Sequence, residues 1–185
     1  MKILGIDPGT TRTGYGVIQK SRGVSLVACG LINGEEVKKE DRLSYLEKEL
    51  GKLVREHKPD LICLEKIFFS KNKKTASSVS EARGVILLVL QRSRIKFIEF
   101  GPSEIKSVVA GSGNASKKEV LRAVCWTLGV KDIPGPDDIS DALAIALRGA
   151  FDPSQRGSWH SVFLEYTCAS LDFASSCEVP KRSFK

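Results

Sequence analysis

Acidic side chains from three distant parts of this sequence could together bind divalent metal ions. Asp7 ends a short apolar run and is followed by a Pro-Gly turn. Glu65 ends a second apolar run, and Asp138 and Asp141 have the three-residue spacing that places two side chains on one face of a helix. Clustered carboxylates repel one another and need cations, and an oxygen-only site suits Mg²⁺ or Mn²⁺ rather than zinc. Two such ions about 4 Å apart can activate a water and stabilise the leaving oxygen of a phosphodiester.

Each of these acids also has an ordinary structural role open to it. Asp7 could cap the turn that follows it, as Asp often does. Asp138 could be the N-cap of the last helix, with Asp141 as its capping-box partner. Four acids that can reach one patch are harder to explain as caps, and the capping interpretation gives Glu65 no role.

A central sheet is needed to bring Asp7 and Glu65 together. The first strand is followed by a hairpin partner and by an extended run at Val24 to Ile32, which predicts an antiparallel meander. Asp41 to His57 has the apolar period of an amphipathic helix, and Asp60 to Glu65 is the next buried strand. A strand-helix-strand order favours a parallel pair, so Asp7 and Glu65 are expected at the same edge of the sheet.

The rest of the pattern is also α/β. Further elements are expected at Thr75 to Arg92, Lys96 to Phe100 (a strand), Ser103 to Val109, Ser116 to Leu128 and Asp138 to Ala150. The segment after residue 150 is rich in Ser and has no clear period. We therefore expect one domain at residues 1–150 and a C-terminal appendage of uncertain order at residues 151–185.

Composition and charge favour a polyanionic partner. The 185 residues are 42% hydrophobic and 28% charged, which is ordinary for a soluble globular protein. The net charge is +7, and residues 151–185 carry as many acidic as basic side chains, so the excess lies in residues 1–150. An acidic pocket on a basic chain suits a site that holds metal ions against one phosphate of a bound nucleic acid.

The remaining compositional signals predict a cytoplasmic protein that does not enter a membrane. The five cysteines are an odd number without a Cys-x-x-Cys pair, as expected of reduced cysteines in the cytosol. Asp7 falls where the apolar part of a signal peptide would lie. The longest apolar run, Val85 to Leu90, is far shorter than the ~20 residues that cross a bilayer.

Several motifs occur in an order and spacing that match a known family over about the first 150 residues. They are LGIDPGTTRTGYGV (4–17), EKIFFSKN (65–72), EARGV (81–85), KSVVAGSG (106–113) and DALAIA (141–146). On these motifs the chain resembles the RuvC family of Holliday junction resolvases, which are crossover junction endodeoxyribonucleases of the ribonuclease H-like superfamily. The first and last motifs are specific only in combination.

The resemblance implies a fold, a reaction and partners. The fold is α/β, with a five-stranded mixed β-sheet flanked by α-helices. The reaction is Mg²⁺-dependent, symmetric nicking of four-way junction DNA during recombination and repair, leaving 5′-phosphate and 3′-hydroxyl ends. Two Mg²⁺ ions are expected per site, with Mn²⁺ able to substitute. The protein is expected to act as a homodimer alongside the branch-migration proteins RuvA and RuvB.

The resemblance also assigns residues. The catalytic, metal-binding acids fall on Asp7, Glu65, Asp138 and Asp141; the spacing to Asp141 selects Asp138 over its neighbour Asp137. The DNA-binding residues implied are Phe68, which would stack on an unpaired base, Lys106 and Lys117 near the scissile phosphate, and Lys71, Lys73 and Lys74 on other phosphates. Core packing of Phe68 and a solvated face for the lysines are the ordinary alternatives.

Other classes of protein share parts of this pattern. Actin-like ATPases and sugar kinases have a phosphate loop that also reads Asp-x-Gly-Thr-Thr, as residues 7–11 do here, but they need a second such domain. Another nuclease of the same superfamily would share the acids but not the basic loop with Phe68. A non-catalytic DNA-binding module would use the acids only as caps.

Overall fold

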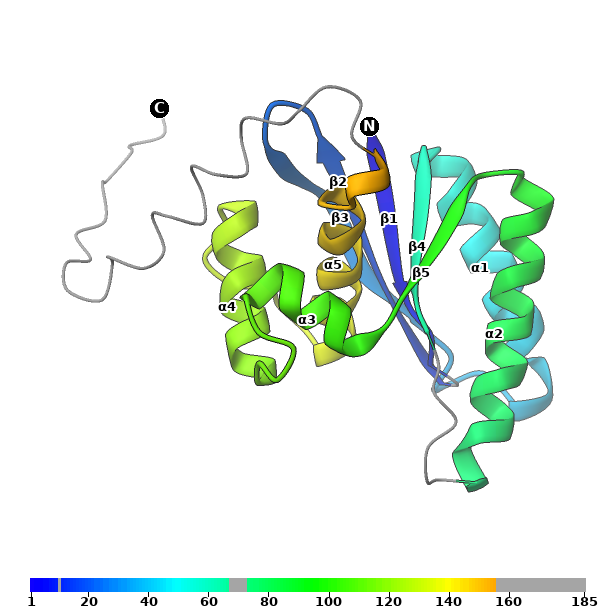
Figure 1. The fold of residues 1–185 in the computed structure, drawn as a ribbon. Helices are drawn as coiled ribbons and strands as arrows, with labels where there is room; N and C mark the ends of the chain where they lie inside the picture. The colour runs from blue at the N-terminus through cyan, green and yellow to red at the C-terminus, as the bar shows by residue number, and fades with distance from the viewer. Residues whose placement is uncertain (10, 67–72, 156–185) are drawn as a thin grey trace, which may run out of the picture. The chain divides into compact units, whose positions relative to one another are not determined.

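The computed structural model describes residues 1–9, 11–66 and 73–155 (Figure 1). The chain divides into two units, Met1–Phe151 and Asp152–Lys185. Of the second unit only residues 152–155 are described, and Pro153–Gln155 form a 3-10 turn there. The appendage expected at residues 151–185 therefore stays a prediction.

The first unit is built on one five-stranded sheet. Its strands are β1 (Lys2–Asp7), β2 (Arg12–Lys20), β3 (Val24–Asn33), β4 (Leu61–Glu65) and β5 (Phe97–Phe100), in the order β3-β2-β1-β4-β5. The pairs β1-β2 and β2-β3 are antiparallel, and β1-β4 and β4-β5 are parallel. The expected meander, the parallel crossover and the mixed five-stranded sheet are all confirmed.

β1 is the middle strand of the sheet, and its side chains are apolar on both faces. Ile3 belongs to the core on one side of the sheet, and Leu4 and Ile6 belong to the core on the other side. All three are fully buried. A strand covered on both faces reads as a continuous apolar run, which is the pattern seen in the sequence.

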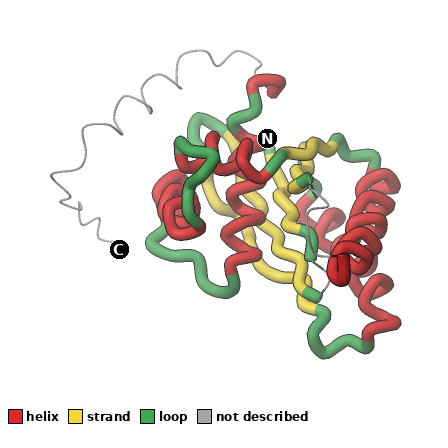
Figure 2. The backbone as a smooth tube through the Cα atoms, turned by 60° about the horizontal axis from the view of Figure 1, so that its bottom comes forward, coloured by secondary structure: helices red, strands yellow, loops and turns green. Residues whose placement is uncertain are grey.

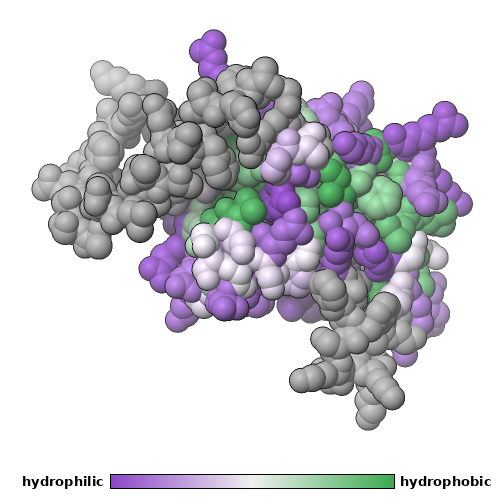
Figure 3. Space-filling view, in the orientation of Figure 1, coloured by the Kyte–Doolittle hydropathy of each residue, from purple (hydrophilic) through white to green (hydrophobic). Residues whose placement is uncertain are grey.

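Helices cover both faces of the sheet (Figures 1 and 2). α1 (Arg42–His57) and α2 (Lys73–Ser93) pack on one face through aliphatic side chains such as Leu50 and Ile86. α3 (Pro102–Ala110), α4 (Lys117–Leu128) and α5 (Asp137–Ala150) lie on the other face. On the face shown in Figure 3, hydrophilic side chains are interspersed with hydrophobic ones. None of the helices in the described part of the chain is long and apolar enough to cross a bilayer.

Most helix boundaries agree with the sequence within two residues. Ser116 is the N-cap of α4 and accepts a hydrogen bond from the Glu119 backbone N–H, which confirms the expected capping box. α2 begins at Lys73, two residues before the start expected at Thr75. The sequence pattern missed these two residues because they have no apolar period that would mark them as helical. A 3-10 turn at Lys39–Asp41 precedes α1, so α1 begins at Arg42.

α5 lies directly against the middle of the sheet. A Cβ atom on Gly5 of β1 would stand 2.1 Å from the Ala142 carbonyl oxygen, and one on Gly16 of β2 would stand 2.6 Å from the Leu143 side chain. Real Cβ atoms essentially never show such distances, so α5 touches the backbone of β1 directly at Gly5, and the Leu143 side chain packs directly on β2 at Gly16. The glycines of the first hairpin therefore admit a second surface.

One buried arginine connects three elements on this face. Arg148 of α5 is only 8% exposed and forms an ion pair with Glu104 of α3. Its guanidinium carbon also lies 4.2 Å from the ring centroid of Phe100, the last residue of β5. Glu104 additionally accepts a hydrogen bond from the Gly101 backbone N–H at the start of α3.

Candidate active site

Two of the predicted acids end neighbouring parallel strands. Ile6 of β1 is paired with Leu64 of β4, so Asp7 and Glu65 follow at the same edge of the sheet. Both are the last residues of their strands, and both are only partly exposed. The edge shared by parallel strands therefore brings together two acids that are far apart in the sequence.

The other two acids reach this edge because of Gly14. Asp7 is paired with Gly14 across the β1-β2 hairpin. A Cβ atom on Gly14 would stand 2.0 Å from the Asp138 carbonyl oxygen and 3.2 Å from the Asp138 Cβ. The absence of a side chain at position 14 thus lets the first turn of α5 lie on the strand beside Asp7, and Asp141 follows one turn later.

The capping alternative for the α5 acids does not describe this helix. Its N-cap is Pro136, which is extended (φ −65°, ψ 159°) and makes no capping side-chain hydrogen bond. Asp137 and Asp138 are the first two helical residues. Carboxylates in a first turn are favoured by the helix dipole, so their position there is stable without a capping bond.

The acids influence one another electrostatically. Burial, followed by the negative charges of Glu65, Asp141 and Asp138, raises the pKa of Asp7 from 3.8 to about 8, and Lys117 opposes the rise. Burial and the charge of Asp141 also raise the pKa of Glu65. Burial raises the pKa of Asp141 as well. A group of carboxylates in this state is stabilised by any cation that enters.

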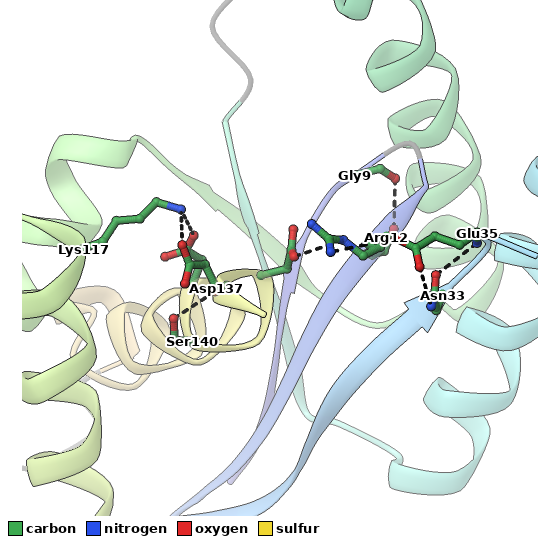
Figure 4. A network of polar contacts seen from close by, with 10 residues as sticks. Gly9, Arg12, Asn33, Glu35, Lys117, Asp137 and Ser140 are labelled. Carbon is green, nitrogen blue, oxygen red and sulfur yellow. Dashed lines mark hydrogen bonds and ion pairs between the residues drawn. The ribbon is translucent and has the colours of Figure 1, made fainter. Parts of the chain in front are cut away.

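Two of the predicted lysines lie beside the acids. Lys117 Nζ is 3.1 Å from Asp137 Oδ2 and 3.5 Å from Asp141 Oδ2 (Figure 4). The hydrogen bond to Asp137 raises the pKa of Lys117, so the side chain stays cationic. Lys106 of α3 is half-buried, and its charge lowers the pKa of Glu65. Both lysines therefore bring positive charge close to the acids.

Arg12 belongs to the site and is not among the residues predicted from the sequence. Its Nε is 3.5 Å from Asp138 Oδ2, and its Nη1 is 3.9 Å from Glu35 Oε1 (Figure 4). The signal was present in the strand period, since Arg12 is two residues before Gly14 and so shares the sheet face on which α5 lies. Recognising it requires knowing first that Gly14 faces the acids.

The donor set fits a hard divalent cation, although the side chains are turned to other partners. Among the described residues, no group of three or more Asp, Glu, His or Cys side chains has metal-ligand geometry. Asp138 faces Arg12, while Asp141 faces Lys117. Carboxylate oxygens gathered at one sheet edge are nevertheless the kind of ligand that hard cations such as Mg²⁺ or Mn²⁺ prefer.

The remaining predicted DNA-binding residues cannot be placed in the site. Phe68 and Lys71 lie outside the described residues. Lys73 and Lys74 are the first two residues of α2, and only their backbone is described. Their roles stay predictions.

A three-stranded antiparallel meander continued by two parallel strands, with acids where β1 and β4 end, defines a ribonuclease H-like α/β protein. A family model described as "Crossover junction endodeoxyribonuclease RuvC" matches residues 3–148. A protein of that name from Prochlorococcus marinus (strain MIT 9312) is 50% identical over 149 residues, 80% of this chain and 94% of the relative.

Solved structures of RuvC proteins are also similar to this chain. The Thermus thermophilus RuvC structure is 30% identical with a TM-score of 0.73, covering 82% of this chain and 94% of that one. T. thermophilus RuvC in complex with Holliday junction substrate is 27% identical, with the same TM-score and coverage. The chain therefore belongs to the RuvC family of crossover junction endodeoxyribonucleases. This membership sets aside the actin-like ATPase alternative.

Proposed function

We propose that this protein is a metal-dependent endonuclease that resolves Holliday junctions by paired, symmetric nicks. The observation that carries the proposal is the partly buried Asp7 carboxylate beside Glu65, Asp138 and Asp141, at an edge where Lys117 also lies. A named relative is a crossover junction endodeoxyribonuclease, and the T. thermophilus relative has been solved with a Holliday junction substrate. The net charge of +7 suits DNA as the partner.

The four acids would hold the metal, with two Mg²⁺ ions per site and Mn²⁺ able to replace them. Bound there, the ions would supply the charge that activates water and stabilises the leaving oxygen of a phosphodiester. Asp7 would be one metal ligand, held in a fixed position as the last residue of the central strand β1. Asp138 and Asp141 come from a helix that touches the sheet through backbone, so their positions are fixed too.

Cationic side chains at the same edge would bind the scissile strand. Lys106 and Lys117 lie beside the acids, and Arg12 is the additional cation there. A phosphate that enters would meet positive charge from both sides of the acidic group. Phe68 would stack on an unpaired base, and the loop lysines Lys71, Lys73 and Lys74 would bind neighbouring phosphates.

A homodimer would supply the two equivalent sites that a two-fold junction needs. The outward face of α2 supports a homodimer. Gly84 is exposed, with no atom within 4 Å of a Cβ built on it, and Leu88 one turn later is 43% exposed. A glycine and a leucine at this spacing suit close approach of a second helix. Cooperation with RuvA and RuvB, and a cytoplasmic location, remain expectations from the family.

A synthetic four-way junction tests the proposal directly. Labelled junction is incubated with the protein in Mg²⁺ and, in parallel, in chelator, and both strands are mapped. Symmetric paired nicks with ligatable ends are expected in Mg²⁺ only. Asp7→Asn should lower cleavage by about 10³-fold or more, because it removes a metal ligand, while junction binding is retained. Normal cleavage by this variant, or nicking in chelator, would contradict the metal-site interpretation.

A further inference from the structure

Glu35 is an acid beside the candidate site that has no role in the proposed chemistry. Its Oε1 is 3.9 Å from Nη1 of Arg12, and Nε of Arg12 is 3.5 Å from Asp138 Oδ2 (Figure 4). The Glu35 side chain is 54% exposed, and the Asp138 side chain is 27% exposed. Arg12 therefore lies between an inner acid, which we propose as a metal ligand, and an outer acid that is exposed to solvent.

The Glu35 carboxylate is held in place by its own segment of the chain. Its backbone N–H donates to Asn33 Oδ1 at 3.0 Å, and Asn33 Nδ2 donates to Glu35 Oε2 at 3.4 Å. Asn33 is paired with Arg12 across β2 and β3. The Gly34 N–H donates to the Thr11 carbonyl oxygen at 2.8 Å, which ties the same segment to the turn between β1 and β2. One carboxylate oxygen of Glu35 is thus engaged by Asn33, and the other faces Arg12.

Lys117 has the same arrangement on the other side of the acids. Its Nζ is 3.1 Å from Asp137 Oδ2 and 3.5 Å from Asp141 Oδ2 (Figure 4). The side chain of Asp137 is 73% exposed, against 35% for that of Asp141. We call Glu35 and Asp137 the outer acids. Arg12 and Lys117 thus each face one inner acid and one outer acid.

A divalent cation would compete with Arg12 and Lys117 for the inner acids. A carboxylate that already faces a positive side chain at 3.5 Å binds a second cation less favourably, because the two cations repel each other. An outer acid offers the side chain a different partner and cancels part of its charge. Because the outer acids are exposed, each of these ion pairs contributes little free energy, and salt weakens it.

We propose that the two outer acids are positioning residues: they draw Arg12 and Lys117 away from the inner acids and so favour binding of a divalent cation. The proposal rests on the proposed function, because it takes the inner acids as metal ligands. Neither outer acid is among the four acids that the resemblance assigns. Their effect passes through the two cations, so each outer acid should matter only while its cation is present.

Binding of Mn²⁺ in the absence of DNA tests the role of Glu35. Free Mn²⁺ is measured by electron paramagnetic resonance at low and at high salt. Glu35→Gln should weaken binding about threefold at low salt, because Arg12 then stays on Asp138, and should have less effect at high salt. Glu36→Gln removes the neighbouring exposed acid and is the control. Equal affinities in these two variants would overturn the proposal.

A double-variant cycle separates this role from a direct attraction between Glu35 and the metal. Arg12→Gln should strengthen Mn²⁺ binding, and Glu35→Gln added to it should have no further effect. Arg12→Lys keeps the positive charge, so its affinity should stay close to that of wild type. If Glu35→Gln weakens binding equally with and without Arg12, the carboxylate does not act through Arg12 and the proposal is wrong.

Asp137 provides a second test on the other side of the acids. Asp137→Asn should weaken Mn²⁺ binding at least as much as Glu35→Gln does, because the contact with Lys117 is the shorter of the two. The effect should vanish when Lys117→Gln is also present. A weakening that persists without Lys117 would contradict the proposal on this side.

The proposed function and the role of the outer acids fail in different ways. If Asp7→Asn leaves Mn²⁺ binding unchanged, the acids are not the metal site and both proposals are wrong. If Mn²⁺ binding depends on Asp7 but not on the outer acids, only the role of the outer acids is wrong.

Discussion

The two faces of the sheet are covered in different ways, and only one of them carries the candidate site. On the face of α1 and α2, large aliphatic side chains such as Leu50 and Ile86 fill the space between helix and sheet. On the face of α5, the helix backbone touches the strands at Gly5 and Gly14. Side chains in a core can repack around a substitution, whereas two backbones in contact cannot. The four candidate acids are therefore found on the face that tolerates substitution least.

The largest effect that would test this comparison is expected at Gly14. In Gly14→Ala the new Cβ would stand 2.0 Å from the Asp138 carbonyl oxygen, so the start of α5 has to move. A displacement of about 1 Å at reacting groups can cost roughly 10²-fold in rate, and we expect a loss of that size in junction nicking. Gly23→Ala is the control, because nothing lies within 4 Å of its Cβ. Equal nicking rates in the two variants would show that α5 is not positioned by this contact.

A core truncation on each face sharpens the comparison. Leu50 and Leu143 are both fully buried, on the α1 side and on the α5 side respectively. Each change to Ala should lower the free energy of unfolding by about 2–5 kcal/mol, as measured by urea denaturation. Nicking by the folded fraction should stay within about twofold for Leu50→Ala but fall further for Leu143→Ala, because Leu143 packs at Gly16. If Leu50→Ala slows nicking as much as Leu143→Ala does, the difference between the two faces is contradicted.

A third test of the comparison is a pH dependence of stability on the α5 face. The pKa of Asp7 is about 8 in the folded protein against 3.8 as the ordinary value, so the folded state binds more protons between these limits. Stability in chelator should fall as pH rises through this window, with at most about 1.4 kcal/mol lost per pH unit. Asp7→Asn removes this loss, so the free energy of unfolding of the variant should exceed that of wild type most clearly near pH 8.

Urea denaturation at pH 5 and pH 8 provides the measurement, with Glu36→Gln, an exposed acid, as the matched control. If the difference in free energy of unfolding between Asp7→Asn and wild type does not grow with pH, the Asp7 carboxylate is not destabilised by its neighbours.

Most of the framework could be predicted because it depends on local patterns. The run at Ile3 to Ile6, the helix after it and the strand ending at Glu65 are sufficient to place two acids at one edge. The hairpin glycines leave room for a close surface, but the local sequence does not identify that surface. That surface is α5, and knowing this required the three-dimensional arrangement of chain segments more than 120 residues apart.

Other parts of the site depend on tertiary contacts that the local pattern does not specify. Arg12 sits in a hairpin that has no charge period, and its partner Asp138 is distant in sequence. The orientation of Asp138 toward Arg12, and of Asp141 toward Lys117, follows from competition among several cations for a few carboxylates. A sequence pattern can indicate that acids gather, but not which cation each one faces.

The buried Arg148 has a consequence for how activity would disappear on unfolding. It connects α5 with Glu104 of α3 and with the ring of Phe100 at the end of β5. Release of α3 alone would leave a buried guanidinium without its carboxylate, which is strongly unfavourable. α3 and α5 should therefore melt as one cooperative unit, so that Lys106 and the aspartate pair are lost in a single step and no half-assembled nuclease persists.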